Sequence, residues 1–223
     1  MAVQVTIDAE LKKKCPAVAL ACVTAEVEAG AGETPAELSE ELRACEEKIL
    51  KLPEPKAVLE SAPILATRAA YKALGKDPAR YRGSAEALLR RIIAGKGLPR
   101  INSVVDVINL VSVQSRLPIG LYDQVHIEGD IAFRAGRAGE TYKGIGKYDL
   151  NLEGLPLFAD TLGPHGSPTS DSERTMVTPA TKLVLAIIIS FGGPQSLGKW
   201  PETMGALLEK YAKAHHHHVE ISE

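Results

Sequence analysis

The chain has 223 residues, of which 45% are apolar, 24% charged and 4% aromatic, and its formal net charge is −2. This length and apolar content can bury a sizeable core without disulfides, which excludes an intrinsically disordered chain. The slightly acidic balance excludes a protein coated all over by nucleic acid, although it permits a local basic patch. The three cysteines form no CxxC pair and no disulfide framework, which favours a reducing, cytoplasmic compartment.

No membrane association is expected from the sequence. Its apolar runs fall far short of the roughly eighteen residues that cross a bilayer. The opening MAVQVTID has neither the charged start nor the apolar stretch of a signal peptide. Four consecutive histidines, His215 to His218, stand near the C-terminus, and we expect them to form a solvated tail outside the functional site.

The N-terminal half is predicted to be mainly helical. Residues 3–7 alternate like a strand, and the apolar run 17–27 predicts a strand covered on both faces. A capping box, Thr34-Pro35-Ala36-Glu37, predicts the start of a long helix. Further helices are expected over residues 62–75, from a cap at Ser84, and from a second capping box that starts at Ser103.

The C-terminal half is predicted to be mainly strands. Short apolar runs separated by Gly, Asp, Pro and Ser indicate a sheet meander, and residues 161–172 are expected to form a long loop. A last amphipathic helix is expected to end near Ala214. We therefore expect a single α+β domain over residues 1–223, a layered sandwich whose helical N-terminal half packs on a mixed or antiparallel sheet from the C-terminal half.

A local basic segment runs from Arg80 to Arg100. Against the one acid Glu86, its six cations are Arg80, Arg82, Arg90, Arg91, Lys96 and Arg100. Such a segment can hold the phosphates of an RNA even when the net charge of the chain is negative. The alternative is a solvated helix face whose arginines pair with glutamates elsewhere.

A polar line marks the apolar helix predicted from Ser103. Asn102, Asp106 and Asn109 follow each other at helical spacing, so they share one face. Buried amides and carboxylates need hydrogen-bond partners. These residues therefore either pin a neighbouring loop or line a pocket for a polar ligand.

Common catalytic and metal-binding patterns are missing from the sequence. It has no GxSxG, no Walker A motif and no HExxH, so neither a metal nor another cofactor is expected. Outside the tail the histidines are His126 and His165, too few for a histidine-rich zinc site, and we expect His165 to lie solvated in its loop.

Five motifs occur in a distinctive order between residues 81 and 190. They are YRGSAEALLRRIIAGKGLPRINSVVDVINLVS, LPIGLYD, EGDIAFR, FAD and SERTMVTPATKLVL. This succession resembles the B3/B4 domain of the bacterial-type phenylalanyl-tRNA synthetase β subunit, and it looks most like freestanding relatives of that domain. The resemblance implies the fold of that domain and an editing activity, the hydrolysis of tyrosine wrongly esterified to the phenylalanine tRNA. Residues 1–80 would then be an N-terminal strand and helix extension.

The resemblance also implies roles for individual residues of this chain. Asn109 and Glu173 match family residues that are implied to act in editing, and Arg134, Tyr122 and Asp106 are expected to line the substrate pocket. Gly120 stands where the family has a histidine. We expect this difference to enlarge the pocket and to alter its amino-acid specificity. Asn109 and Glu173 are expected to face one cavity between the Ser103 helix and the sheet.

The resemblance therefore favours a tRNA-binding module that hydrolyses a mischarged aminoacyl ester in trans. The six cations of the basic segment would bind the RNA, with the aminoacylated 3′ end in the pocket. A chain of this length without class II motifs is not a complete aminoacyl-tRNA ligase. The alternatives are a non-catalytic protein that binds tRNA or a small ligand, and a small-molecule hydrolase without RNA binding.

Overall fold

A computed structural model describes residues 3–27, 33–146 and 148–223. The α-helices are α1 (Ala9–Lys14), α2 (Ala36–Leu50), α3 (Ala62–Ala73), α4 (Ser84–Ile93), α5 (Ser103–Ser115) and α6 (Trp200–Ala212). The strands are β1 (Val5–Ile7), β2 (Ala19–Glu26), β3 (Ile119–Asp123), β4 (Ile131–Ala135), β5 (Thr141–Lys143), β6 (Asp149–Asn151), β7 (Pro156–Asp160), β8 (Gly163–Gly166), β9 (Leu183–Ser190) and β10 (His215–Ser222). Short 3-10 helices are η1 (Pro55–Glu60), η2 (Gln124–His126), η3 (Glu173–Thr175) and η4 (Pro194–Ser196).

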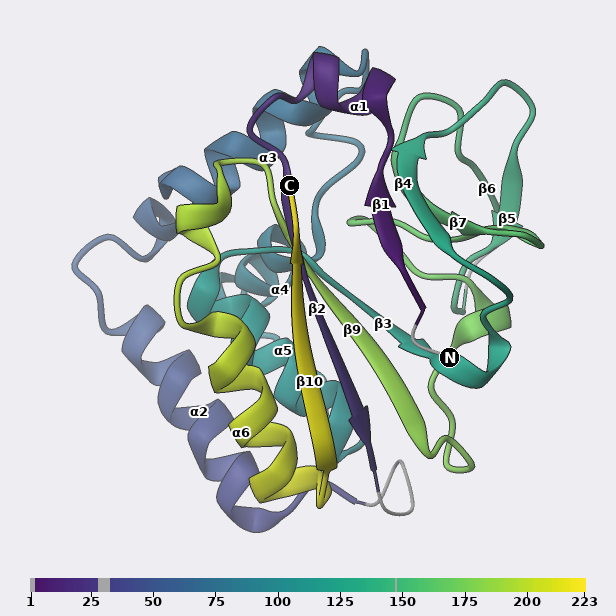
Figure 1. The fold of residues 1–223 in the computed structure, drawn as a ribbon. Helices are drawn as coiled ribbons and strands as arrows, with labels where there is room; N and C mark the ends of the chain where they lie inside the picture. The colour runs from purple at the N-terminus through teal and green to yellow at the C-terminus, as the bar shows by residue number, and fades with distance from the viewer. Residues whose placement is uncertain (1–2, 28–32, 147) are drawn as a thin grey trace.

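The elements form three layers (Figure 1). Helices α2, α4, α5 and α6 cover one face of a sheet in the order β10-β2-β9-β3. A second sheet, in the order β1-β4-β7-β8, lies beyond the other face of the first. The predicted α+β class and helix-on-sheet layering are confirmed. The sheets are not built from the C-terminal half alone, however, because β2 lies inside the first sheet and β1 pairs in parallel with β4.

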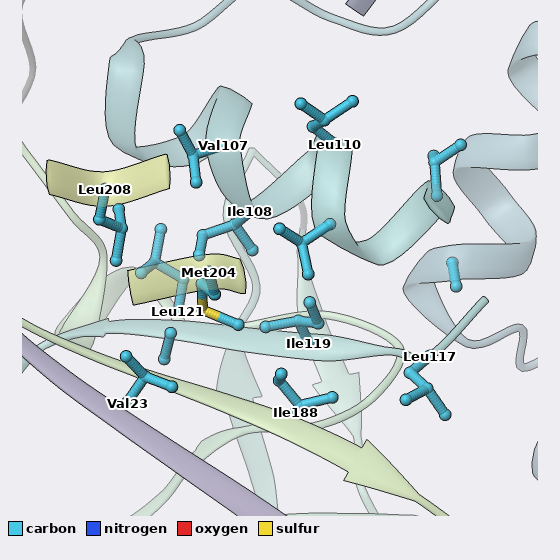
Figure 2. Close-up of a cluster of buried hydrophobic side chains, with 14 of the residues drawn as sticks. Val23, Val107, Ile108, Leu110, Leu117, Ile119, Leu121, Ile188, Met204 and Leu208 are labelled. Carbon is cyan, nitrogen blue, oxygen red and sulfur yellow. The ribbon is translucent and has the colours of Figure 1, made fainter. Parts of the chain in front are cut away.

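The central strand β9 separates two apolar cores. Its even-numbered residues, such as Val184 and Ile188, pack with the helices, while Leu185 and Ile187 face the second sheet. Figure 2 shows the helical side of this arrangement, where α5 and α6 lie over β3, β9 and β2. The prediction that the strand within 17–27 is covered on both faces is also confirmed, since β2 contributes to both cores.

The predicted capping box at Thr34 is wrong. The N-cap of α2 is Pro35, which makes no side-chain cap. Thr34 Oγ1 instead donates a hydrogen bond to Asp106 Oδ2, and Asp106 Oδ1 accepts from the Ile101 backbone N–H at 3.0 Å. Because Asp106 is completely buried, satisfying its carboxylate takes priority over a cap at the exposed end of α2. Asp106 therefore pins two neighbouring segments, which is one of the two roles expected for the polar line.

Two other predicted caps are shifted by one residue. Helix α5 is capped by Asn102, whose Oδ1 accepts from the Val105 N–H at 2.9 Å, instead of by Ser103. Helix α4 begins at Ser84 and its N-cap is Gly83. The Ser84 hydroxyl is used elsewhere, because its Oγ accepts from the Ile119 N–H at the edge of β3.

The histidine run is not a solvated tail. His215 to His218 begin β10, which pairs antiparallel with β2 over residues 215–222 and forms one edge of the first sheet. His217 lies against α6, where its Nδ1 is 2.7 Å from Glu209 Oε1. The pairing uses backbone groups, so a strand of polar side chains can cover the edge of β2.

Other expectations concern the cysteines, the long loop and the membrane. Cys15, Cys22 and Cys45 are free thiols. Residues 161–172 are not all loop, since they contain β8. In the three described stretches of the chain, no helix combines the length and apolarity needed to span a bilayer.

Asp106 generates a prediction about stability and pH. Burial raises the pKa of this carboxyl group above its ordinary value, against the opposing hydrogen bonds from Thr34 and Ile101. The folded protein thus holds this proton more tightly than the unfolded chain, so the stability that Asp106 contributes is full below about pH 4 and falls as pH rises through the raised pKa. The Asp106→Asn variant keeps the shape of the side chain but has no carboxyl group that titrates. Its stability relative to wild type should therefore grow with pH over this window in urea denaturation.

A matched variant separates the charge from the hydrogen bonds. Asp106→Ala leaves Thr34 and the Ile101 N–H without their acceptor and should lower the free energy of unfolding by about 1–3 kcal/mol. A difference between Asp106→Asn and wild type that stays constant with pH would contradict the raised pKa.

Candidate ligand-binding site

Strand β3 forms the edge of the first sheet opposite β10, and two segments dock on it. The Ile119 N–H donates to Ser84 Oγ at 3.3 Å, and the Leu121 N–H donates to Asp171 Oδ2 at 3.4 Å. The start of α4 and the segment after β8 are thereby held beside β3. Gly120 and Tyr122, which the family resemblance singled out, belong to this strand.

Tyr122 fills the space beside Gly120. Its side chain is fully buried, and a Cβ added to Gly120 would lie 2.1 Å from the Tyr122 hydroxyl oxygen. A Cβ added to Gly166 on β8 would lie 2.2 Å from the same oxygen. The phenol thus lies between two glycines from different sheets. The expectation that Gly120 leaves an enlarged pocket is wrong, because the tyrosine two residues along the strand occupies the space.

His165 packs edge-on against this phenol. The two ring centroids are 4.7 Å apart with the planes at 87°. The imidazole is fully buried, contrary to the expected solvated position, and burial lowers its pKa to about 4, so it is neutral at pH 7. Within the described part of the chain, neither ring nitrogen has a hydrogen-bond partner. A neutral imidazole has one donor and one acceptor, so His165 offers both to a bound group or to water.

Asp171 and Ser172 complete the polar cluster, a name used here for Tyr122, His165, Asp171 and Ser172. Burial, reinforced by the nearby Asp171 carboxylate, holds the pKa of Tyr122 well above its usual value, so the phenol keeps its proton. The Ser172 hydroxyl is buried, and none of the described residues hydrogen-bonds to it. The cluster therefore places a phenol, a neutral imidazole and a hydroxyl inside an apolar wall, and none of its side chains lines the cavities around Trp200, Arg134, Ile93, Tyr81 and Lys182.

Glu173 and Asn109 lie on different elements, η3 and α5. Glu173 begins η3, is partly exposed, and forms an ion pair with Lys143 Nζ at 2.9 Å. Asn109 is partly exposed on α5. The cavities that the structure defines around Trp200, Arg134, Ile93, Tyr81 and Lys182 include neither side chain. The structure therefore does not bring Asn109 and Glu173 together in any of these cavities.

Arg134 does not join the polar cluster. It forms a bidentate ion pair with Glu140 at 2.8 and 2.7 Å. It lines a separate cavity of about 390 Å³ with Arg137 and Asp160 on the second sheet. A guanidinium satisfied by a carboxylate in this way holds the local turn in place.

The basic segment is partly neutralised. Arg90 pairs at 2.8 Å with Glu86, which also binds Arg68, and Arg100 pairs with Glu46 at 3.2 Å. The alternative of pairing with glutamates thus holds for these two arginines. Arg91 Nε donates to the Gly97 carbonyl, whereas Arg82 and Lys96 are exposed and have no ion pair with any residue the structure describes.

One end of the basic segment reaches the surroundings of the polar cluster. Arg80 lies over the Tyr81 ring at 5.4 Å, and both line a cavity of about 420 Å³ with Ser167 and Thr169. The Ser167 hydroxyl accepts from the buried Tyr142 hydroxyl, in the loop that leads to Asp171. This cavity is within the size range of small-ligand pockets, about 300–1,000 Å³.

Comparison with known proteins identifies the family. Residues 66–195, more than half of the chain, match the model of the B3/4 domain. The chain belongs to the B3/4 domain family. This match encloses the motifs at 81–190, and the predicted resemblance is confirmed.

Relatives of the chain are phenylalanine–tRNA ligase β subunits. The subunit from Paramagnetospirillum magneticum is 31% identical over 83 residues, which is 37% of this chain and 10% of the relative. The subunit from Brucella abortus is 32% identical over 69 residues, 30% of this chain and 9% of the relative. The chain thus matches about a tenth of the length of these relatives. A solved N-terminal fragment of the Pyrococcus horikoshii phenylalanyl-tRNA synthetase β subunit aligns with 100% of this chain and 51% of its own, at 18% identity and a TM-score of 0.47.

The close packing of Tyr122 against Gly120 leads to a testable prediction about stability. Gly120→Ala should lower the free energy of unfolding by about 1–3 kcal/mol, because the new methyl group overlaps the Tyr122 ring. In a Tyr122→Leu background the overlapping atoms are gone, and the same change should cost much less. A double-mutant cycle by urea denaturation measures this coupling.

A second glycine provides the control. Gly192→Ala, whose added Cβ would come no closer than 3.2 Å to another atom, should cost the same in both backgrounds. Equal costs for Gly120→Ala in the two backgrounds would show that Tyr122 does not occupy this space.

Proposed function

We propose that this chain is an editing-type module that binds the aminoacylated 3′ end of a tRNA and hydrolyses a mischarged aminoacyl ester. The observation that carries the proposal is the B3/4 match over residues 66–195, because this region contains the whole polar cluster at the edge of β3. The names of the relatives, phenylalanine–tRNA ligase β subunits, support a tRNA as the partner.

The reaction requires little from the protein. A water molecule adds to the ester carbonyl, the tetrahedral oxyanion collapses, and the ribose oxygen leaves with a proton to give the free amino acid and the uncharged tRNA. Because the ester is already activated, hydrolysis needs only a water molecule positioned beside the carbonyl carbon and hydrogen-bond donors near the oxyanion. The neutral imidazole of His165 and the Ser172 hydroxyl are groups that can hold such a water.

Glu173 is proposed to recognise the amino acid. An aminoacyl ester has a free ammonium group, and a carboxylate is its natural partner. Glu173 lies at the start of η3, next in sequence to the polar cluster, and is held by Lys143 from β5. On substrate binding, the substrate ammonium group would replace Lys143 as the ion-pair partner of Glu173.

A second candidate function is binding of tRNA or of a small ligand without turnover. Tyr122 favours it, since the phenol fills the space beside Gly120 and leaves less room for a substrate side chain. Both functions retain the fold and the basic segment. They differ in whether an ester bond is cleaved.

Hydrolysis is tested with a panel of mischarged tRNAs. Under the editing proposal the wild-type protein cleaves at least one member, and Glu173→Ala lowers its rate constant at least tenfold, equivalent to about 1.4 kcal/mol of transition-state stabilisation. Glu37→Ala, an exposed glutamate on α2, is the control and should leave the rate unchanged. Wild-type protein that binds tRNA but cleaves no member of a broad panel would support the second function.

Salt dependence tests the basic segment. Arg82 and Lys96 are the chosen positions, because Arg90 also holds the buried Glu86. If the two cations neutralise phosphates, Arg82→Ala with Lys96→Ala should reduce the slope of log affinity against log salt by roughly 0.7–0.9 for each phosphate that is no longer neutralised. Lys13→Ala with Lys51→Ala removes the same charge from α1 and the end of α2 and should leave the slope unchanged. Equal slopes for both double variants and wild type would show that Arg82 and Lys96 do not neutralise phosphates.

A further inference from the structure

A cavity of about 610 Å³ lies where α2, the end of α5 and the start of α6 meet. Its walls are Glu41, Ala44, Cys45, Lys48, Ile49, Leu52, Gln114, Arg116, Lys199 and Trp200. Much of this lining, including Lys48 and Trp200, comes from residues outside the B3/4 match at 66–195. The cavity is separate from the polar cluster, and its volume suits a small molecule.

Arg116 supplies a buried donor without an acceptor. Its Nη1 is shielded from solvent and has no hydrogen-bond partner among the described residues. Burial lowers the pKa of Arg116, although the guanidinium remains charged at pH 7. An unpaired buried donor costs free energy, and a bound oxyanion would remove that cost through a charge-assisted hydrogen bond.

The backbone does not explain why position 116 carries an arginine. Arg116 ends α5 in the left-handed conformation, with φ of 66°. Glycine adopts this conformation at lower cost and is the usual residue at such a helix end. A role for the side chain in the cavity accounts for the arginine.

The cavity is electropositive. Lys48 and Lys199 join Arg116 in its lining, against the single acid Glu41. Glu41 already accepts from Lys210 at 3.1 Å and from the Tyr211 hydroxyl, so its charge is offset. Burial raises the pKa of the Cys45 thiol, which therefore stays neutral and supplies no counter-charge to Arg116.

Part of the cavity lining is apolar and contains a large ring. Trp200 lines the cavity with Ile49 and Leu52, and Lys199 Nζ lies 5.3 Å from the Trp200 ring centroid. Leu52 is 40% exposed, which leaves apolar surface open to water. A flat apolar group placed here gains both burial and ring contact.

We propose that this cavity binds a small ligand with a phosphate or carboxylate attached to a planar ring. The oxyanion accepts from the Arg116 fork between the two lysines, and the ring packs against Trp200 and Leu52. This inference does not depend on the proposed editing function, because the two sites share no residue.

Ligand binding is measured by the fluorescence of Trp200, the one tryptophan of the chain. The probes are AMP and benzoate, which carry a ring with a phosphate or a carboxylate, and adenosine and ribose 5-phosphate, which each lack one of the two parts. AMP, benzoate or both should change the emission saturably, and the two incomplete probes should bind at least tenfold more weakly. Comparison of AMP with benzoate distinguishes the two oxyanions. No saturable change with any probe, or adenosine binding as tightly as AMP, would overturn the proposal.

Variants of Arg116 test the guanidinium. Arg116→Gly removes it while relieving the backbone at φ of 66°, so the variant should be at least as stable as wild type and lose at least tenfold in affinity for the better probe. Arg116→Lys keeps the charge but not the fork and should retain part of the affinity. The matched control is Arg43→Gln, an exposed arginine on α2 outside the cavity, which should bind as wild type does. Unchanged affinity in both Arg116 variants, or an equal loss in Arg43→Gln, would overturn the proposal.

Discussion

Strand β9 has to be apolar on both faces, and the architecture depends on this constraint. The run Leu183–Ser190 lies between β2 and β3, with the helices against one face and the second sheet against the other. Each face therefore contributes to a different core, and a polar residue at almost any position of β9 would be buried without a partner. Among the described strands β3 pairs only with β9, so its other edge is left for Ser84 and Asp171. This arrangement places the polar cluster between the two sheets.

Local periodicity was sufficient to locate most helices and the buried strands. The helix ends were less predictable, since a cap depends on which partners the fold brings close. Thr34 bonds to Asp106, 72 residues later, and Ser84 bonds to an amide on β3. The strand formed by the histidine run was missed for a related reason. Its pairing with β2 uses backbone groups, and a composition of exposed polar side chains does not reveal it.

The candidate site was predictable as a region but not in its geometry. The order of motifs located the family, which the match confirms, and the matched residues 66–195 include the segments around Gly120 and Glu173. The position of the Tyr122 ring depends on Gly166, which is distant in sequence and belongs to the other sheet. The burial of His165 has the same origin, because nothing in the local sequence GPHGS shows that β8 will face β3 across the second core. Sequence spacing alone also could not show that Arg134 forms an ion pair with Glu140.

The pairing of early with late segments sets the order in which this domain can form. Residues 19–26 of β2 pair on one side with 183–190 and on the other with 215–222, and Ser222 Oγ donates to the carbonyl of Val5 at 2.9 Å. Closing such long loops is entropically costly and slows folding. During synthesis, β2 must wait with both edges unpaired until more than 150 further residues have followed it. An apolar strand left open for that time exposes apolar faces and unpaired edges, which makes the incomplete chain prone to aggregation.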